Sequence, residues 1–189
     1  MKNMTLENIA KACKGTLYAM GSSGSESDAL QREAEASCVV IDSRKVERGG
    51  IFIATRGEKV DGHSFISDVA EKGALGVVCE ELPENCEVPC ILVKDSFQAL
   101  KEIAEFYRKQ LAVRVVGITG SVGKTSTKEF IAAVLSVKYK VLKTMGNFNN
   151  EIGLPLTVLS IREEHEVAVL EMGISDFGEM HRLSKIARP

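Results

Sequence analysis

The sequence predicts an α/β protein in two parts: a small mixed α/β domain over residues 1–111 and, over residues 112–189, the first part of a parallel-sheet domain with a phosphate-binding loop. Apolar runs of strand length lack the polar alternation of half-exposed strands, and helical segments separate them. This pattern is typical of a parallel sheet that helices cover on both faces. A glycine-rich turn also joins one such strand to a helix near residue 120. The composition, 44% apolar and 26% charged, is that of an ordinary globular protein.

Strands and helices follow one another along the first part. Thr5 is a candidate N-cap of a helix over 5–14 that ends at Gly15, and the small polar residues of 21–37 predict a loop. The clearest amphipathic helix covers 96–111, where apolar residues recur at helical spacing on one side. The remaining elements that we predict are strands at 37–44, 51–55, 76–80 and 90–94, and a helix at 63–72 that ends at Gly73.

The second part begins at a boundary that we place near residues 110–112. It predicts strands at 113–119, 140–144 and 166–173, and helices at about 125–137 and at 178–187. Three strands are few for a doubly wound sheet, which usually has about five or more. We therefore expect the chain to be the front portion of a longer protein.

Charge excludes several classes of partner. With 24 Lys and Arg against 26 Asp and Glu, the net charge is −2, which offers no general attraction for nucleic acid or an anionic membrane. No apolar run approaches the roughly 20 residues of a membrane span, so we expect no membrane insertion.

The N-terminal residues do not form a secretory signal, and the five cysteines are an odd number. Both observations favour reduced thiols and a cytoplasmic protein.

The glycine-rich turn has the residues that phosphate binding requires. Gly120 and Gly123 allow a tight turn that brings backbone N–H groups to phosphate oxygens, and the helix that follows adds its positive end. Lys124 can reach the β- and γ-phosphates of a nucleotide, and the Thr125 hydroxyl can bind Mg²⁺. Ile118 stands where the strict P-loop pattern requires its first glycine, so the match is to the shorter G-x-x-G-K-T. A glycine turn with an exposed lysine is the structural alternative.

A carboxylate for Mg²⁺ is expected at the end of a neighbouring strand. Glu171 follows four apolar residues and ends the 166–173 strand, where the ligand edge of a parallel sheet lies. We predict that it holds Mg²⁺ together with Thr125. The alternative is an N-cap or a surface acid.

These motifs resemble those of the ATP-dependent Mur ligases, which build the peptide stem of peptidoglycan. The phosphate loop T-G-S-V-G-K-T-S at 119–126 is similar to theirs and also lacks the first glycine. The segment T-M-G-N-F-N-N-E-I-G-L-P-L-T at 144–157, and E-M-G at 171–173 with G-E-M at 178–180, are similar to the branch that uses D-Ala-D-Ala. In the first part, D-S-R at 42–44, G-G-I-F-I-A at 49–54, Gly57, D-G-H at 61–63 and G-A at 73–74 resemble the UDP-binding domain of the family.

The resemblance implies an activity and a set of nucleotide-site residues. Members of this branch use ATP and Mg²⁺ to add D-Ala-D-Ala to UDP-N-acetylmuramoyl-tripeptide through an acyl phosphate, in peptidoglycan precursor synthesis. By the match, Lys124 is the catalytic residue, and Thr125 and Glu171 hold Mg²⁺. The nucleotide would contact Gly120, Ser121, Val122, Gly123, Lys124, Thr125 and Ser126, together with Asn149 and Asn150.

The same resemblance assigns residues to the UDP-sugar peptide. Ser43 and Arg44 would contact the uridine diphosphate portion, and Asp61, His63 and Asn147 the precursor as well. Each has a structural alternative: an ion pair for Arg44, a helix start for His63, and turn hydrogen bonds for the asparagines.

The resemblance also implies that parts of the machinery lie beyond Pro189: a carbamylated lysine, a histidine near a second metal, and a C-terminal domain for the adenine and the dipeptide. We therefore expect a monomer that cannot complete the ligation alone. A non-catalytic fragment that binds the UDP-precursor is the first alternative, and a small P-loop kinase or NTPase is the second.

Overall fold

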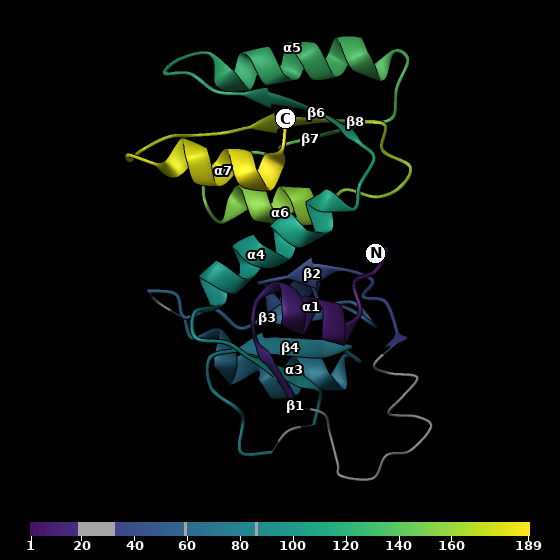
Figure 1. Ribbon diagram of the computed structural model, residues 1–189, viewed down its shortest axis with the longest axis vertical. Coiled ribbons are helices and arrows are strands. Elements are labelled where there is room, and N and C mark those ends of the chain that lie inside the picture. The colour runs from purple at the N-terminus through teal and green to yellow at the C-terminus, as the bar shows by residue number, and fades with distance from the viewer. Residues whose placement is uncertain (19–32, 59, 86) are drawn as a thin grey trace. The chain divides into compact units, whose positions relative to one another are not determined.

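The computed structural model describes residues 1–18, 33–58, 60–85 and 87–189, and it divides the chain into two compact units (Figure 1). Unit 1 covers Met1–Ile103, and unit 2 covers Ala104–Pro189. The division between them falls after Ile103, within helix α4 (Ser96–Lys109) and before the boundary that we expected near 110–112. Most of the loop expected at 21–37 lies outside the described residues.

Unit 1 contains a five-stranded sheet in the order β1-β5-β4-β3-β2. Strands β2 (Val39–Val40), β3 (Ile51–Ile53), β4 (Gly76–Cys79) and β5 (Cys90–Leu92) pair in parallel, and β1 (Thr16–Tyr18) pairs antiparallel with β5. All three residues of β3 and all four of β4 are buried. This explains why these strands carry no polar alternation in the sequence.

Helices cover both faces of this sheet. Helix α1 (Leu6–Ala12) lies on one face, because a Cβ on Gly76 would meet the side chains of Leu6 and Ile51. Helix α3 (Ile66–Glu71) packs on the other face, in a cluster that includes Phe52 and Val77. The short 3-10 helices η1 (Ser43–Lys45) and η2 (Gly62–Phe65) follow β2 and β3.

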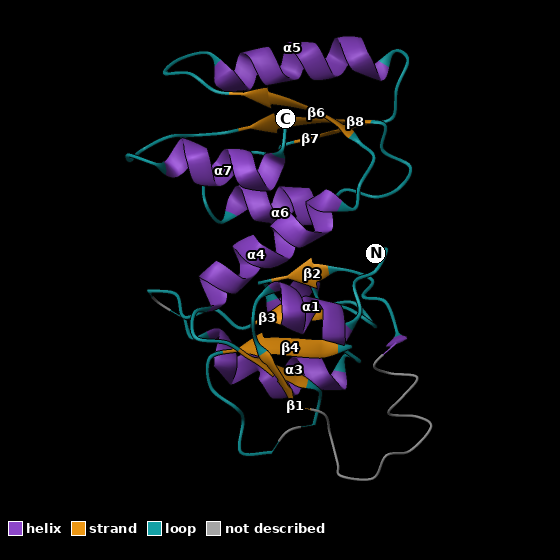
Figure 2. Ribbon diagram, in the orientation of Figure 1, coloured by secondary structure: helices purple, strands orange, loops and turns teal. Residues whose placement is uncertain are grey.

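Unit 2 is a three-stranded parallel sheet in the order β6-β8-β7, with α5 on one face and α6 and α7 on the other (Figure 2). The strands are β6 (Arg114–Ile118), β7 (Val141–Lys143) and β8 (Val167–Glu171), and the helices are α5 (Lys124–Ser136), α6 (Gly153–Leu159) and α7 (Glu179–Ala187). Strand β8 is central and wholly buried. Its Val167 and Val169 pack with Ala132 of α5 in a hydrophobic cluster. The α/β class and the parallel arrangement predicted from the sequence are confirmed.

The structure differs from the predicted elements at four places. Helix α6 and the edge strand β1 were not predicted, the expected helix over 63–72 is a 3-10 turn followed by α3, and the strand expected over 37–44 is only the two residues of β2. Helix α1 is capped by the Thr5 hydroxyl as expected, but Lys14, and not Gly15, takes the left-handed backbone conformation after it. Gly15 is required for space, because a Cβ there would lie 2.6 Å from the Ile91 side chain.

Candidate functional site

The carboxyl ends of the three parallel strands in unit 2 bring the predicted nucleotide-site residues to one edge of the sheet. The glycine turn follows β6, the asparagine segment follows β7, and Glu171 ends β8. Because β8 lies between β6 and β7, Glu171 stands between the other two loops. The order of the strands in the sheet, and not their order along the chain, therefore brings these residues together.

The turn after β6 has the backbone geometry of a phosphate-binding loop. Gly120 and Gly123 have φ angles of 139° and 79°, which favour glycine. Gly123 is the N-cap of α5 and provides no side-chain cap, so the first N–H groups of the helix face a ligand position. The Lys124 ammonium donates a 2.8 Å hydrogen bond to the Gly120 carbonyl and thus folds back over the turn.

Glu171 is the centre of a hydrogen-bond cluster that joins the three loops. Thr125 Oγ1 lies 3.3 Å from Glu171 Oε1 and 3.1 Å from Oε2, and Asn149 Nδ2 donates to Oε1 at 2.8 Å. The backbone N–H of Glu171 donates to the buried Thr144 hydroxyl at 2.9 Å. The structure therefore brings together Thr125 and Glu171, the pair expected to hold Mg²⁺, and adds Asn149 to them.

The residues present fit a magnesium ion. Mg²⁺ prefers oxygen ligands and is commonly bound by one or two protein carboxylates together with phosphate oxygens. The Thr125 hydroxyl and the Glu171 carboxylate offer such oxygens beside the loop that would hold the phosphates. Among the described residues there is no group of three or more His, Cys, Asp or Glu side chains arranged for a metal ion. The arrangement thus suits a metal ion that is bound partly by these two side chains and partly by the phosphate oxygens of a nucleotide.

Sequence reasoning missed a buried lysine in this cluster. Lys128 Nζ lies 3.7 Å from Glu171 Oε2 and 3.3 Å from Glu129 Oε1, and its side chain is only 2% exposed. The available signal was its spacing: it lies three residues after Thr125, so the two side chains share a face of α5. Glu129 also pairs with Lys143, and the hydrogen bonds from Lys143 and Lys128 lower the pKa of Glu129.

The two other asparagines lie close by but make turn contacts. Asn150 Oδ1 accepts hydrogen bonds from the N–H groups of Ile152 and Gly153, and so caps the start of α6. Asn147 is exposed, and its carbonyl accepts from the Asn149 N–H at 2.7 Å. Ser121, Val122 and Ser126 are exposed on the turn and on the first turn of α5.

In unit 1, the residues expected to bind the UDP portion lie at η1. Arg44 forms hydrogen bonds of 2.9 and 2.8 Å with the Asp42 carboxylate, and its side chain is exposed. This guanidinium lowers the pKa of Asp42 to about 2. The Ser43 carbonyl accepts a hydrogen bond from Lys72 at 2.8 Å. A negatively charged ligand would therefore have to displace the Asp42 carboxylate from Arg44.

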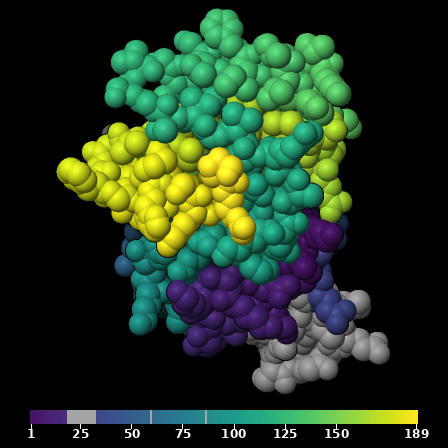
Figure 3. Space-filling model, turned by 45° about the horizontal axis from the view of Figure 1, so that its top comes forward, coloured from purple at the N-terminus to yellow at the C-terminus, as the bar shows by residue number. Residues whose placement is uncertain are grey.

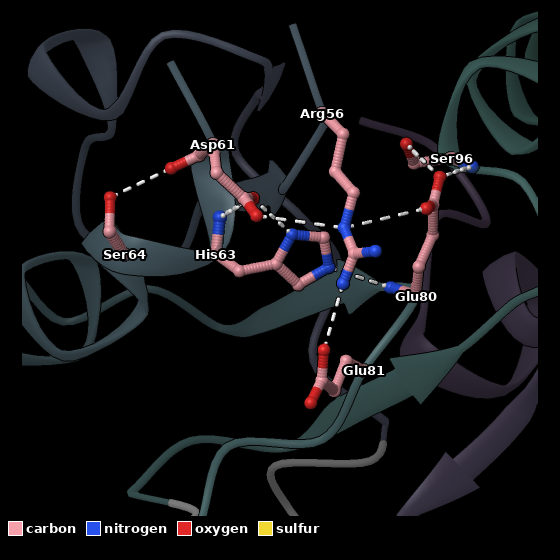
Figure 4. Close-up of polar contacts among 7 residues, drawn as sticks. All are labelled: Arg56, Asp61, His63, Ser64, Glu80, Glu81 and Ser96. Carbon is pink, nitrogen blue, oxygen red and sulfur yellow. Dashed lines mark hydrogen bonds and ion pairs between the residues drawn. The ribbon is translucent and has the colours of Figure 1, made fainter.

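Asp61 and His63 belong to a polar network at the carboxyl side of β3 and β4 (Figure 4). His63 Nδ1 lies 2.6 Å from Asp61 Oδ1, and His63 Nε2 accepts the Glu80 N–H at 2.9 Å. The ring is thus the tautomer with its proton on Nδ1, and both nitrogens are in use. Asp61 also accepts the His63 N–H, and this bond and the His63 ring lower the pKa of Asp61.

Arg56 and Glu80, which the sequence analysis did not select, complete this network. Arg56 pairs with Asp61, Glu80 and Glu81, and Glu80 Oε1 accepts from the N–H and hydroxyl of Ser96 at the start of α4 (Figure 4). The network therefore fixes the loop of Asp61 and His63 to the end of β4 and to α4. Nothing in the sequence signalled these contacts, because their members lie far apart along the chain.

The parallel sheet of unit 2, the glycine turn after β6 and the acid at the end of the adjacent β8 define an α/β protein of the P-loop class. A sequence model described as the Mur ligase middle domain matches residues 118–189, and one described as the Mur ligase family catalytic domain matches residues 35–114. The chain belongs to the Mur ligase family.

Individual relatives agree with this assignment. The UDP-N-acetylmuramoyl-tripeptide–D-alanyl-D-alanine ligase of Bacillus subtilis is 45% identical over 193 residues, which are 100% of this chain and 40% of that protein. MurF from Acinetobacter baumannii has a TM-score of 0.82 at 34% identity, over 98% of this chain and 39% of that one. MurF ligase from Thermotoga maritima in complex with ADP has a TM-score of 0.70 at 38% identity, over 79% and 35%. The chain thus spans 35–40% of the length of these relatives.

The parts of the chain that the structure describes contain no helix both long enough and apolar enough to cross a lipid bilayer. Among the described residues, Cys13, Cys38 and Cys79 are free thiols.

Proposed function

We propose that this chain carries the UDP-precursor-binding and ATP-binding portions of a ligase that joins D-Ala-D-Ala to UDP-N-acetylmuramoyl-tripeptide. The names of relatives that match the chain over 100% and 80% of its length support this reaction. The ADP complex of a structural neighbour supports nucleotide binding by this chain. The free thiols fit the cytoplasm, which is where we propose that the protein acts.

The proposed reaction has two steps. An oxygen of the terminal carboxylate of the tripeptide attacks the γ-phosphorus of ATP, the bond to the β,γ-bridging oxygen breaks, and ADP leaves. The amine nitrogen of D-Ala-D-Ala then attacks the acyl carbon, the C–O bond to phosphate breaks, and the amine loses its proton. The products are the amide, ADP and inorganic phosphate.

The residues of unit 2 bind and orient the nucleotide in this proposal. The N–H groups at the start of α5 and the turn of Gly120–Ser126 hold the phosphates, and Lys124 leaves the Gly120 carbonyl to stabilise the transferred phosphoryl group. Thr125 and Glu171 would hold Mg²⁺, which would neutralise phosphate charge when bound. Asn149 orients the Glu171 carboxylate, and Asn150 holds the adjoining segment against α6.

The residues of unit 1 bind the precursor. Ser43 and Arg44 contact the diphosphate of UDP, since Arg44 is exposed and its guanidinium suits phosphate oxygens. Asp61 and His63 contribute by fixing the loop that follows β3, because both nitrogens of the ring are already in use. In unit 2, Asn147 is exposed in the loop after β7, and we propose that it contacts the peptide portion.

The observation that carries the proposal is the approach of Thr125 to within 3.1 Å of Glu171 beside the glycine turn. Two calorimetric titrations of the 189-residue protein test it, one with Mg-ATP and one with UDP-N-acetylmuramoyl-tripeptide. We expect saturable binding of both. Binding of the precursor without ATP would favour the non-catalytic fragment instead, and failure of both would refute the proposal.

A further inference from the structure

We propose that Lys128 is a positioning residue, which acts through Glu171 to hold its carboxylate where the Mg²⁺ of a bound nucleotide is captured. This inference rests on the proposed function, because it concerns the metal at the same nucleotide site. It assigns a role to a lysine that lies on α5 behind the phosphate loop and that the loop motif itself does not include.

The Lys128 ammonium lies inside the protein, next to the carboxylate expected to bind the metal. Its side chain is 2% exposed, and so is that of Glu171, whose Oε2 lies 3.7 Å from Nζ. The second carboxylate in reach is Glu129 at 3.3 Å, but that side chain is 47% exposed and is also paired with Lys143. The buried partner of the ammonium is therefore Glu171.

The contacts of Glu171 show what Lys128 contributes. Asn149 donates to Oε1, the Thr144 hydroxyl accepts the backbone N–H, and Thr125 contacts both carboxylate oxygens. Lys128 supplies the one positive charge among the side chains that face this carboxylate in the described structure. Asn149 and Lys128 thus contact one carboxylate oxygen each, and Thr125, the other residue that would hold the metal, contacts both.

Stability alone does not explain a lysine at this position. Removing an ammonium from water is costly, and a buried ion pair is often no more stabilising than an apolar residue of similar size. A methionine would fill the same space without that cost. In contrast, removal of a group that orients a metal ligand without touching the metal commonly lowers metal affinity by about 10- to 100-fold.

The experiment measures the affinity of the 189-residue protein for ATP by calorimetry, with saturating Mg²⁺ and with EDTA. The ratio of the two affinities is the gain that the metal provides. We expect Lys128→Met to reduce this gain by about tenfold and to leave the affinity in EDTA within about twofold of wild type. Glu171→Gln removes the charge of the expected metal ligand itself, so it should give the largest reduction of this gain. Lys128→Arg keeps the positive charge and should therefore retain part of the gain.

Lys143→Met is the matched control, because it removes the same charge from the outer end of the same chain of ion pairs. It should leave the gain within about twofold of wild type. An unchanged gain in Lys128→Met, or an equal loss in Lys143→Met, would overturn the inference. A wild-type protein that does not bind ATP would instead refute the proposed function, and this inference would fall with it.

A folding defect in Lys128→Met would be informative in itself. That variant leaves the buried Glu171 carboxylate without its cation, so the double variant Lys128→Met with Glu171→Gln should unfold at a higher temperature than Lys128→Met alone. A double variant that is no more stable than the single one would show that Glu171 is not the partner through which Lys128 acts.

Discussion

The two units hold their predicted ligand residues in different ways. In unit 2, Thr125 and Glu171 come from separate loops and meet at 3.1 Å at the edge of a parallel sheet. In unit 1, the carboxylates that hold the selected residues are near neighbours: Asp42 holds Arg44, and Asp61 holds His63, whose ring also accepts the Glu80 N–H. The first arrangement is built by the topology of the sheet, whereas the carboxylate contacts of Arg44 and His63 in the second lie within local turns.

This difference shows which kind of evidence identifies a site. Thr125 and Glu171 converge from distant segments without a reason in local structure, and they do so beside a turn with the geometry of a phosphate-binding loop. The two features together indicate a ligand. Side chains that satisfy each other within a 3-10 turn are explained by the turn itself, as Asp61 is by capping η2. The nucleotide site is therefore supported by geometry, whereas the precursor site depends more on the similarity to known Mur ligases.

The largest effect that we predict is on nucleotide binding in unit 2. Lys124→Ala should weaken Mg-ATP binding by about 100-fold, because it removes a charge-assisted contact to the phosphates. Precursor binding should stay within about twofold of wild type, and both are measured by calorimetry. Lys138→Ala, which removes an exposed lysine elsewhere in unit 2, is the control and should change neither. A folded Lys124→Ala protein that loses the precursor would contradict the division of labour between the units.

Much of the fold could be predicted because its signals are local. The β6 strand, the glycine turn and α5 follow each other without a break, and each has its own sequence signal. Helix α6 was missed because its start, N-N-E-I-G-L-P, is made of residues typical of turns. Asn150 caps it, Pro155 falls in its first turn, and burial of nearly all its residues stabilises it. Such burial depends on the rest of unit 2 and leaves no local signal.

The candidate site was predictable only in part, for a related reason. Glu171 could be found because an acid that ends an apolar strand points to the ligand edge of the sheet. Lys128 was missed, because its spacing from Thr125 was the only signal and a lysine on a helix normally lies on the solvent side. The tertiary structure turns it inward. The network of Arg56 and Glu80 likewise joins segments that no spacing rule connects.

A smaller effect is expected in unit 1, on stability. His63→Ala should lower the free energy of unfolding of this unit by about 1–2 kcal/mol, because the Glu80 N–H and the Asp61 carboxylate each lose a partner. Precursor affinity should fall by only a few-fold. Urea unfolding and calorimetry measure the two effects, and exposed His181 provides the control variant His181→Ala. Large loss of precursor affinity at unchanged stability would instead place His63 in direct contact with the ligand.

The smallest effect concerns Arg44. Its guanidinium holds the folded-state pKa of Asp42 at about 2, below the ordinary value of 3.8, so the pair stabilises the fold above about pH 4 and ceases to do so as the pH falls through about 2. In Arg44→Gln, the pKa of Asp42 should rise toward its ordinary range, and Tm at neutral pH should change by about 2 °C or less, because the pair is exposed. Titration of the Asp42 carboxyl carbon by NMR measures this shift. The same titration of the wild-type protein with bound precursor sharpens the comparison. If Arg44 turns to the diphosphate, the pKa of Asp42 rises as it does in the variant. If Arg44 stays with Asp42, the pKa of Asp42 remains about 2 and the ion pair is purely structural.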